Sequence, residues 1–294
     1  MTRREHYRDL YAGPVRDGRP LGLIHGNCQA EAVRVLLSGS STFGWQLARV
    51  PPVHELEPDD LPPLDRLLGA CTLLLTQPVA ADYRGLPLGA GQLSDRLAPG
   101  ATVVRWPVVR HVGTFPWQAT IRVPDGAEPP LVPYHDLRTL TGRTPRDPDL
   151  RAAAERSLQE LARREQRDAD VGVSDALTDL GADAMHTLNH PGNAVLVLLA
   201  RRLQQAVGEP ADATDPGRTL LGAVRTPLEA EVLSALGLDH GAARDHWLVG
   251  GHPVTAETVA AAHRDWYAQR PDAVAEGLAR YADVLPELGL ATPV

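Results

Sequence analysis

The stretch that most constrains the fold is LGLIHGNCQAEAVRVLL, which covers residues 21–37. Its apolar start, residues 21–25, predicts a short strand. Residues 26–29, Gly-Asn-Cys-Gln, predict a turn, and the apolar positions of residues 30–37 then recur at helical spacing. Ser-Gly-Ser at residues 38–40 predicts the end of this helix. A strand that enters a helix through a tight turn is typical of α/β proteins.

Three further stretches of the N-terminal half read as strands. Residues 71–76, Cys-Thr-Leu-Leu-Leu-Thr, are almost continuously apolar, as expected of a strand that is covered on both faces. Residues 46–50 and 101–105 are the other two candidates. Because the connections between these strands are long enough to contain helices, we predict an α/β fold with a mainly parallel sheet in the N-terminal half.

The second half of the chain changes character and predicts a largely helical C-terminal half. The predicted helices cover residues 150–168, 175–185, 191–207, 227–236, 255–270 and 271–288. We therefore divide the chain into an N-terminal lead-in (1–20), an α/β lobe that carries the cysteine motif (21–144) and a helical lobe (145–294). No flexible linker separates the two lobes, so we expect them to pack as one unit.

The charged residues exclude several classes of protein. The formal net charge is -8, which does not favour a nucleic-acid partner. All 29 basic residues are arginine, so neither a Schiff-base lysine nor a P-loop lysine is available. An anionic ligand would have to be held by arginine, by backbone N–H groups or by a helix N-terminus.

The sequence gives no sign of export or of a membrane span. The charged start, Met-Thr-Arg-Arg-Glu-His at residues 1–6, lacks the apolar core of a signal peptide. The longest apolar run, residues 194–200, is far too short to cross a bilayer. The two cysteines, Cys28 and Cys71, have no CxxC spacing, which argues against a disulfide scaffold. We expect a cytoplasmic protein, for which a homo-oligomer is possible.

Cys28 stands where the predicted strand turns into the helix. That position lies at the carboxyl end of a strand, where α/β proteins bind ligands. A helix N-terminus lowers the pKa of a thiol, and Asn27 and Gln29 offer amide donors for an oxyanion. The other interpretation is that Cys28 is a small buried apolar residue, the commonest role of an unbridged cysteine. Cys71 begins an apolar strand, so packing is its expected role.

A thiolate nucleophile needs a base, usually a histidine from elsewhere in the fold. The best candidate is His190 in Asn189-His190-Pro191, because Pro191 suits the first position of the following helix and would place His190 near its N-cap. A proline-stiffened cap with an exposed histidine is the alternative. His186, four residues earlier, could contact a ligand or be structural.

A metal site is not predicted. No HExxH or other compact ligand spacing occurs, and the nearest cluster, Tyr134-His135-Asp136, reads as part of a loop.

Three features taken together resemble the WcbI family of polysaccharide-biosynthesis proteins. They are Gly-Asn-Cys-Gln at residues 26–29, Gln77 at the end of a second strand, and Asn189-His190-Pro191 before an apolar helix. The resemblance spans roughly residues 21–205. It implies a protein that binds coenzyme A and transfers an acyl group, with the motif cysteine in its active site.

Carried over residue by residue, the resemblance makes Cys28 the active-site thiol, Gln29 its motif partner and His190 the base. Gly26, Asn27, Gln77 and Asn189 would line the substrate or cofactor site, and His186 is a further binding candidate that the motifs of the resemblance do not include. His25 departs from the apolar or small residue expected before the motif. It is either an extra polar group in the site or an outward-facing residue at the strand end.

The resemblance implies a CoA-dependent acyltransferase, acetyl being the simplest acyl group, that acts on a hydroxyl of a glycan or a small metabolite. Coenzyme A would serve as cosubstrate, without a metal. Two alternatives use the same pocket. One is a cysteine-dependent esterase or thioesterase with water as acceptor, and the other is a non-catalytic protein that binds CoA or a glycan.

Overall fold

The computed structural model describes residues 2–290, which form two compact units. Unit 1 comprises residues 2–109, 162–177 and 193–221, and unit 2 comprises residues 110–161, 178–192 and 222–290. Each unit is assembled from several chain segments, so these contact-based units do not follow the expected division at residue 144. That division, and the packing of the two lobes, stay predictions.

The core of unit 1 is a parallel four-stranded sheet, as expected for the α/β class. Its strands are β1 (Leu21–His25), β2 (Gln46–Ala48), β3 (Cys71–Thr76) and β4 (Thr102–Arg105). All three pairings are parallel, and the strand order is β2-β1-β3-β4. The strands fall within the stretches predicted from the sequence.

The strand order determines where a ligand can bind. The chain passes from β1 to β2 on one side of β1, and β3 then pairs on its other side. A crevice forms at the carboxyl ends of two neighbouring parallel strands when their connections leave in opposite directions. In this sheet the switch lies between β1 and β3, so their last residues, His25 and Thr76, mark the expected position of a site.

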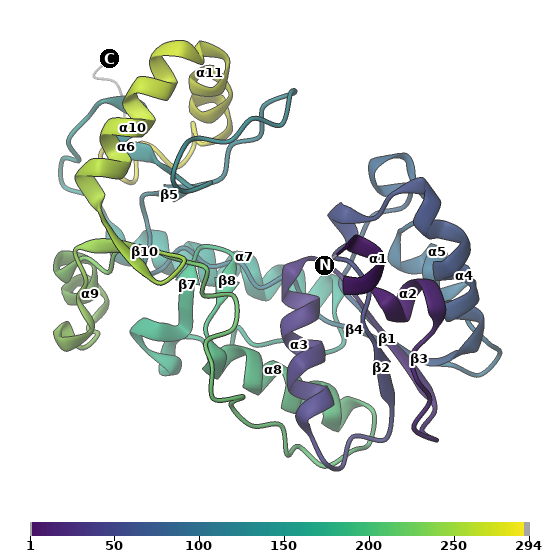
Figure 1. The fold of residues 1–294 in the computed structure, drawn as a ribbon. Helices are drawn as coiled ribbons and strands as arrows, with labels where there is room; N and C mark the ends of the chain where they lie inside the picture. The colour runs from purple at the N-terminus through teal and green to yellow at the C-terminus, as the bar shows by residue number, and fades with distance from the viewer. Residues whose placement is uncertain (1, 291–294) are drawn as a thin grey trace. The chain divides into compact units, whose positions relative to one another are not determined.

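Helices cover both faces of this sheet (Figure 1). Helix α3 (Cys28–Gly39) lies on one side and packs against α8 (Asn193–Ala206). Helices α4 (Leu61–Ala70) and α5 (Ala90–Ser94) lie on the other side. The two apolar faces of the sheet are thereby removed from water, which is why the strands read as continuous apolar runs.

The remaining elements of unit 1 are short. They are α1 (Arg3–His6), α2 (Arg8–Ala12) and the 3₁₀ turns η1 (Val53–Glu55), η2 (Pro58–Asp60) and η3 (Tyr83–Gly85). The expected N-terminal lead-in thus begins with two short helices, and Leu10 of α2 is buried in the core beside α4. The long helix α7 (Leu150–Asp168), predicted from the sequence with the same bounds, contributes residues to both units.

Unit 2 is built from small antiparallel sheets and helices. A three-stranded sheet has the order β11-β10-β9, with β9 (Val224–Arg225), β10 (His246–Val249) and β11 (His252–Thr255). Two hairpin-like pairs join β5 (Gln118–Ala119) to β6 (His135–Asp136) and β7 (Met185–Thr187) to β8 (His190–Pro191). These short strands were not predicted from the sequence.

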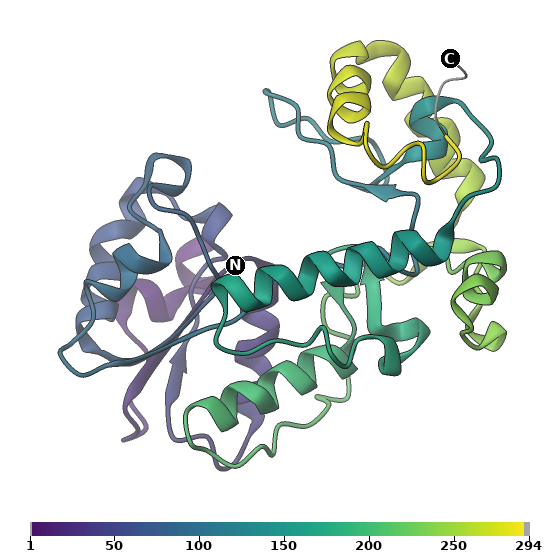
Figure 2. The ribbon, with the colours of Figure 1, turned by 180° about the vertical axis from the view of Figure 1, so that it is seen from behind.

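The helices of unit 2 include the C-terminal ones that the sequence predicts. They are α6 (Leu137–Thr141), α9 (Ala230–Leu236), α10 (Ala256–Gln269) and α11 (Pro271–Arg280), with 3₁₀ turns η4 (Thr178–Leu180), η5 (Ala182–Ala184) and η6 (His240–Ala242). Figure 2 shows α10 and α11, in yellow-green and yellow, beside α6. Their apolar side chains share one core cluster with Trp117.

Three predicted helices differ from the structure. Residues 175–185 form turns and two 3₁₀ turns, because Gly181 has φ of 72° and interrupts the chain. Pro191 is not the first helical residue: it lies in β8, Gly192 N–H donates to the Ala184 carbonyl at 2.8 Å, and α8 begins only at Asn193. Helix α11 ends at Arg280 rather than near residue 288.

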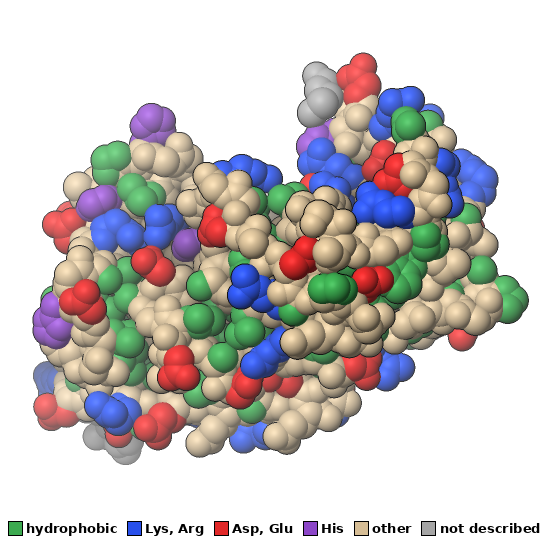
Figure 3. All heavy atoms as spheres, turned by 90° about the horizontal axis from the view of Figure 1, so that it is seen from below, with side chains coloured by type: hydrophobic (Ala, Val, Ile, Leu, Met, Phe, Trp, Pro, Cys, Tyr) green, Lys and Arg blue, Asp and Glu red, His purple; other side chains and the backbone are tan. Residues whose placement is uncertain are grey.

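The face of the molecule in Figure 3 has mixed charge. On the face shown in Figure 3, arginine side chains are interspersed with aspartate and glutamate side chains. No helix among residues 2–290 is both long enough and apolar enough to cross a membrane. Within the same residues, no group of three or more His, Cys, Asp or Glu side chains is placed to hold a metal ion.

Candidate active site

The Gly-Asn-Cys-Gln turn lies at the switch point of the unit 1 sheet. Strand β1 ends at His25 and helix α3 begins at Cys28. Asn27 is the N-cap of the helix, and its side-chain oxygen accepts the Gln29 N–H at 2.9 Å. The Gly26 carbonyl accepts the Val53 N–H at 2.7 Å, which fixes the other end of the turn.

Gln77 reaches this turn from the end of the neighbouring strand β3. Its Oε1 accepts the backbone N–H of Asn27 at 2.8 Å, and its Nε2 donates to Oε1 of Gln29 at 3.1 Å. A Cβ on Gly26 would come within 2.8 Å of Cδ of Gln77, so only glycine leaves room for this amide. The structure therefore brings together the predicted residues Gly26, Asn27, Gln29 and Gln77.

Gln29 is completely buried, and its amide is engaged within unit 1. Nε2 donates to the Val109 carbonyl at 2.8 Å, and Oε1 accepts the Val109 N–H at 3.1 Å. The side chain thus ties the helix start to the segment that follows β4. Its expected contact with a reacting oxyanion stays a prediction, because the observed partners are backbone groups of the protein.

The pKa of Cys28 is raised, so the expected lowering of its pKa was wrong. Burial is the largest cause because it penalises the thiolate, and the charge of Glu55 acts in the same direction. Backbone hydrogen bonds at Cys28 and Gln29 favour the thiolate but do not outweigh burial. Cys28 is half-buried, whereas Cys71 is fully buried in the core, in agreement with its expected packing role. Neither cysteine forms a disulfide within residues 2–290.

The His25 side chain is buried and contacts a backbone group of the protein. It is 2% exposed, and its Nε2 lies 3.0 Å from the Leu88 carbonyl oxygen. Burial lowers its pKa to about 4, which leaves the ring neutral near pH 7. Of the two alternatives, the outward-facing residue is therefore wrong, since the ring is enclosed.

The other predicted residues lie in unit 2, on the β7–β8 hairpin. The Tyr134 hydroxyl donates to Oδ1 of Asn189 at 2.8 Å and lies 3.3 Å from Nδ1 of His190. The Thr187 hydroxyl donates to both the Tyr134 and the Asn189 oxygens at 3.1 Å. This network orients the His190 ring, whose pKa is lowered to about 4 by burial.

His186 is enclosed in the same unit. Its side chain is buried, and neither ring nitrogen has a hydrogen-bond partner among the described residues. Burial lowers its pKa to about 4, and the nearby charges of Arg225 and Arg244 act in the same direction.

The structure therefore assembles two groups of predicted residues. Gly26, Asn27, Cys28, Gln29 and Gln77 form the first, in unit 1; Asn189 and His190 form the second, in unit 2. The pairing of Cys28 with His190, and the catalytic and binding roles of all these residues, stay predictions.

Sequence reasoning missed two residues of the second group, Tyr134 and Thr187. Tyr134 stood out only as a neighbour of His135 in a possible metal cluster. Its real partners lie more than 50 residues away, and no local pattern announces such a contact.

The comparisons with known proteins identify the family to which the chain is similar. The sequence model of the family described as "Polysaccharide biosynthesis enzyme WcbI" matches residues 21–212, well over half of the chain. A solved structure of WcbI, described as the native protein without a disulfide bond between coenzyme A and one of its cysteines, has a TM-score of 0.76 and 19% sequence identity. The alignment covers 92% of this chain and 98% of that chain. A search among curated proteins gave no match.

Proposed function

Because the chain belongs to the WcbI family of polysaccharide biosynthesis enzymes, we propose that it transfers an acyl group from a CoA thioester to a hydroxyl of a glycan or a small metabolite. Cys28 and His190 would carry the reaction, and Gln29 and Gln77 would hold the turn that presents the thiol. Acetyl is the simplest acyl group for this role.

One observation carries the proposal. Cys28 begins a helix at the switch point of a parallel sheet, and the side chain of Gln77 from the adjacent strand holds the turn before it. Such a position is where open α/β sheets bind ligands. The dipole of α3 places partial positive charge at its N-terminus, which suits a developing oxyanion.

Coenzyme A as acyl carrier is supported by the related solved structure, whose description names coenzyme A and a cysteine together. In this chain the motif cysteine is Cys28. A thioester carbonyl placed against the sulfur of Cys28 would lie beside the start of α3.

The proposed reaction begins from an uncharged thiol and an uncharged imidazole, not from a preformed thiolate–imidazolium ion pair. Near pH 7 the Cys28 thiol is protonated and the His190 ring is neutral. In the covalent route, Nε2 of His190 takes the thiol proton while sulfur attacks the thioester carbonyl, and CoA leaves with that proton as a thiol. The acceptor hydroxyl then gives its proton to His190 and attacks the acyl-cysteine, and the Cys28 sulfur regains the proton.

A direct route uses the same residues without an acyl-enzyme. Nε2 of His190 would deprotonate the acceptor hydroxyl as it attacks the thioester itself. The proton would then pass to the departing CoA sulfur. Cys28 would in that case only position the thioester.

Incubation of the full-length protein with acetyl-CoA separates these routes. The covalent route requires an adduct of about 42 Da in the intact mass, the mass of an acetyl group replacing a hydrogen. The adduct should be lost in Cys28→Ser and retained in Cys71→Ala, the matched control. His190→Gln should slow its formation by roughly 10²- to 10⁴-fold, the usual contribution of a positioned base.

The other possible outcomes also distinguish between the proposed routes. CoA release without an adduct, but only when an alcohol acceptor is present, supports the direct route. Release that is equally fast without any hydroxyl acceptor would show a hydrolase and overturn acyl transfer. Neither adduct nor CoA release, with or without acceptors, would overturn the proposed chemistry altogether.

A further inference from the structure

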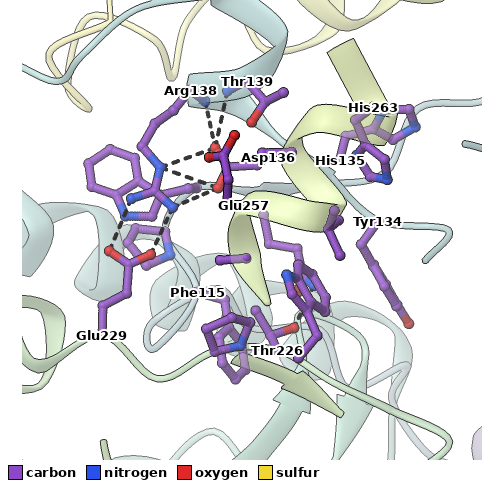
Figure 4. Close-up of a pocket in the computed structure, with 18 of the residues that line it drawn as sticks. Phe115, Tyr134, His135, Asp136, Arg138, Thr139, Thr226, Glu229, Glu257 and His263 are labelled. Atoms are coloured by element: carbon purple, nitrogen blue, oxygen red, sulfur yellow. Dashed lines mark hydrogen bonds and ion pairs between the residues drawn. The ribbon is translucent and has the colours of Figure 1, made fainter. Parts of the chain in front are cut away.

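Unit 2 contains a pocket of about 470 Å³, within the usual range for small-molecule sites. Every residue that lines it belongs to unit 2. Figure 4 shows these side chains converging from the β5–β6 pair, α6, the start of α9 and α10. None of the residues predicted from the sequence as site residues lines it.

Aromatic side chains form a large part of the pocket wall. Phe115, Trp117, Tyr134 and Trp247 all line it, and all four are at least nine-tenths buried as side chains of the core. Flat aromatic surfaces provide contact area for the C–H faces of a ligand at little cost in conformational entropy.

The charged residues that line the pocket balance in number: three arginines, Arg138, Arg143 and Arg264, face three carboxylates, Asp136, Glu229 and Glu257. Figure 4 shows the Arg138 guanidinium between Asp136 and Glu229, with hydrogen bonds of 2.7 Å to a carboxylate oxygen of each. Arg264 is paired with Glu257 at 2.6 Å. An anionic ligand would have to compete with these carboxylates for the guanidinium groups of Arg138 and Arg264.

The two histidines of the pocket add no positive charge. His135 and His263 are buried, and burial lowers the pKa of both; that of His135 falls to about 4. The lining therefore offers polar contacts without a net charge, which suits an uncharged ligand.

Two buried polar groups of the lining have no partner among the described residues. They are the Thr114 hydroxyl and the Trp117 indole N–H, on side chains that are 8% and 6% exposed. A buried polar group without a hydrogen bond is costly, and such groups are few in native proteins. A ligand that carries hydroxyl groups would satisfy both, since a hydroxyl both donates and accepts.

We propose that this pocket binds an uncharged sugar unit, whose C–H faces lie against the aromatic wall and whose hydroxyl groups bond to Thr114 and Trp117. Apolar lining with a few convergent polar groups fits such a ligand. The paired Arg138, Asp136 and Glu229 retain acceptor and donor positions at the rim for further hydroxyl groups.

One wall residue connects the pocket to the predicted base. Tyr134 lines the pocket, and its hydroxyl, which Figure 4 shows pointing away from the other labelled residues, contacts Asn189 and His190. The identification of the bound sugar as the acyl acceptor rests on the proposed function. Sugar binding itself does not.

Binding is tested with methyl glycosides of glucose, galactose and mannose, and with the corresponding uronic acids as charged probes. The indole N–H signals in a ¹H–¹⁵N spectrum, assigned with Trp117→Phe, report on the pocket. We expect a neutral glycoside to shift the Trp117 signal, and acetyl-CoA and the uronic acids to leave it in place. A shift caused by acetyl-CoA, or a stronger one by a uronic acid, would overturn the proposal, as would the absence of any shift with all three glycosides.

Three variants locate the contacts. Trp117→Phe and Thr114→Val should each weaken glycoside binding about three- to tenfold, the loss expected for one hydrogen bond. Trp106→Phe is the matched control, because the Trp106 indole N–H is also buried without a partner in the described chain but lies in unit 1. Because Trp117→Phe also shortens a core side chain, melting of the free variants is compared with that of Trp106→Phe, so that a loss of binding is separated from a loss of stability. Undiminished binding in both pocket variants would overturn the assignment.

The two proposals fail separately. Cys28→Ser should still bind the glycoside, because Cys28 does not line the pocket. Glycoside binding without any acyl transfer would leave the sugar site standing and overturn the proposed function. Acyl transfer to an alcohol with no sugar bound at Trp117 would do the reverse.

Discussion

Gln77 is a single side chain on which the geometry of the cysteine turn depends. Its Oε1 holds the Asn27 N–H, its Nε2 holds Gln29, and its own backbone N–H donates to the His25 carbonyl at 2.9 Å. The amide is 1% exposed, so it makes these bonds in place of bonds to water. The geometry of the turn thus depends on a side chain for which we propose no part in the reaction itself.

Gly26→Ala tests this dependence. The added methyl group meets the Gln77 amide, so we expect the loss of the bond between Gln77 and Asn27 and a destabilisation of about 1–3 kcal/mol in thermal or denaturant unfolding. Gly39→Ala, at the end of the same helix, is the control: a Cβ there meets no atom within 4 Å, so stability should stay the same or rise. Equal stability of both variants would contradict the steric role of Gly26.

The raised pKa of Cys28 predicts a slow thiol in the free protein. Alkylation by iodoacetamide should increase with pH and reach half of its maximal rate above the pH of an ordinary thiol, about 8.5. Glu55→Gln should shift this profile to lower pH, because the Glu55 charge opposes the thiolate. Cys28→Ser measures the background from Cys71, whose pKa of about 12 keeps it unreactive. A midpoint below 8 in the parent protein would contradict the burial argument.

At the scale of elements, Arg138 joins the starts of two helices. Asp136 is the N-cap of α6 and Glu229 is the N-cap residue of α9, and the Arg138 guanidinium bonds to both carboxylates. The guanidinium also lies over the Trp117 ring, 4.9 Å from its centroid. These contacts fix one rim of the unit 2 pocket.

Arg138→Gln should therefore cost about 1.5–3 kcal/mol of unfolding free energy, the range for hydrogen bonds to charged groups. Arg264→Gln is the matched control from the same pocket: its ion pair with Glu257 is exposed, so its loss should cost at most about 1 kcal/mol. Denaturant unfolding of both variants measures the difference. A smaller loss for Arg138→Gln than for the control would show that the two caps are not joined through this residue.

The local sequence pattern correctly predicted the helices and strands whose formation does not depend on one particular distant segment. The strands at residues 21–25 and 71–76 and the helix at residues 150–168 are long or strongly periodic, and the structure confirms them. The two-residue strands β5, β6 and β8 exist only because a distant segment pairs with them. Pro191 was wrongly predicted to begin a helix. Its preference for the first helical position is outweighed by its pairing with Met185.

The candidate site was predictable to the same extent. The turn at residues 26–29 was predicted from the local pattern, and Gln77 was assigned to the site through the family resemblance; the structure shows the hydrogen bond between them. The engagement of Gln29 by Val109, 80 residues away, did not follow from spacing. The predicted direction of the Cys28 pKa shift was wrong because burial depends on the folded chain and not on the motif alone.

At the scale of the whole molecule, the buried histidines are distributed unequally. His111, His135, His186 and His190 in unit 2 and His25 in unit 1 all have their pKa lowered to about 4, each mainly by burial. In the unfolded chain a histidine has a pKa of about 6.5. Between these two values the unfolded chain binds protons that the folded chain does not.

Stability should therefore fall as the pH decreases from about 6.5 toward 4, by up to about 1.4 kcal/mol per pH unit for each buried histidine, and unit 2 should open before unit 1. Hydrogen-exchange mass spectrometry across this range resolves the two units by peptide.

His186→Phe should reduce the pH dependence of the stability of unit 2 at little cost in stability near pH 7, because neither ring nitrogen of His186 has a partner within residues 2–290. His54→Gln, at a half-exposed side chain in unit 1, is the control for the replacement of an imidazole that is not buried. Carboxylates with lowered pKa values, such as Asp212 at about 2, act mainly below this window. Earlier opening of unit 1 on acidification would therefore contradict the assignment of the acid response to the buried imidazoles.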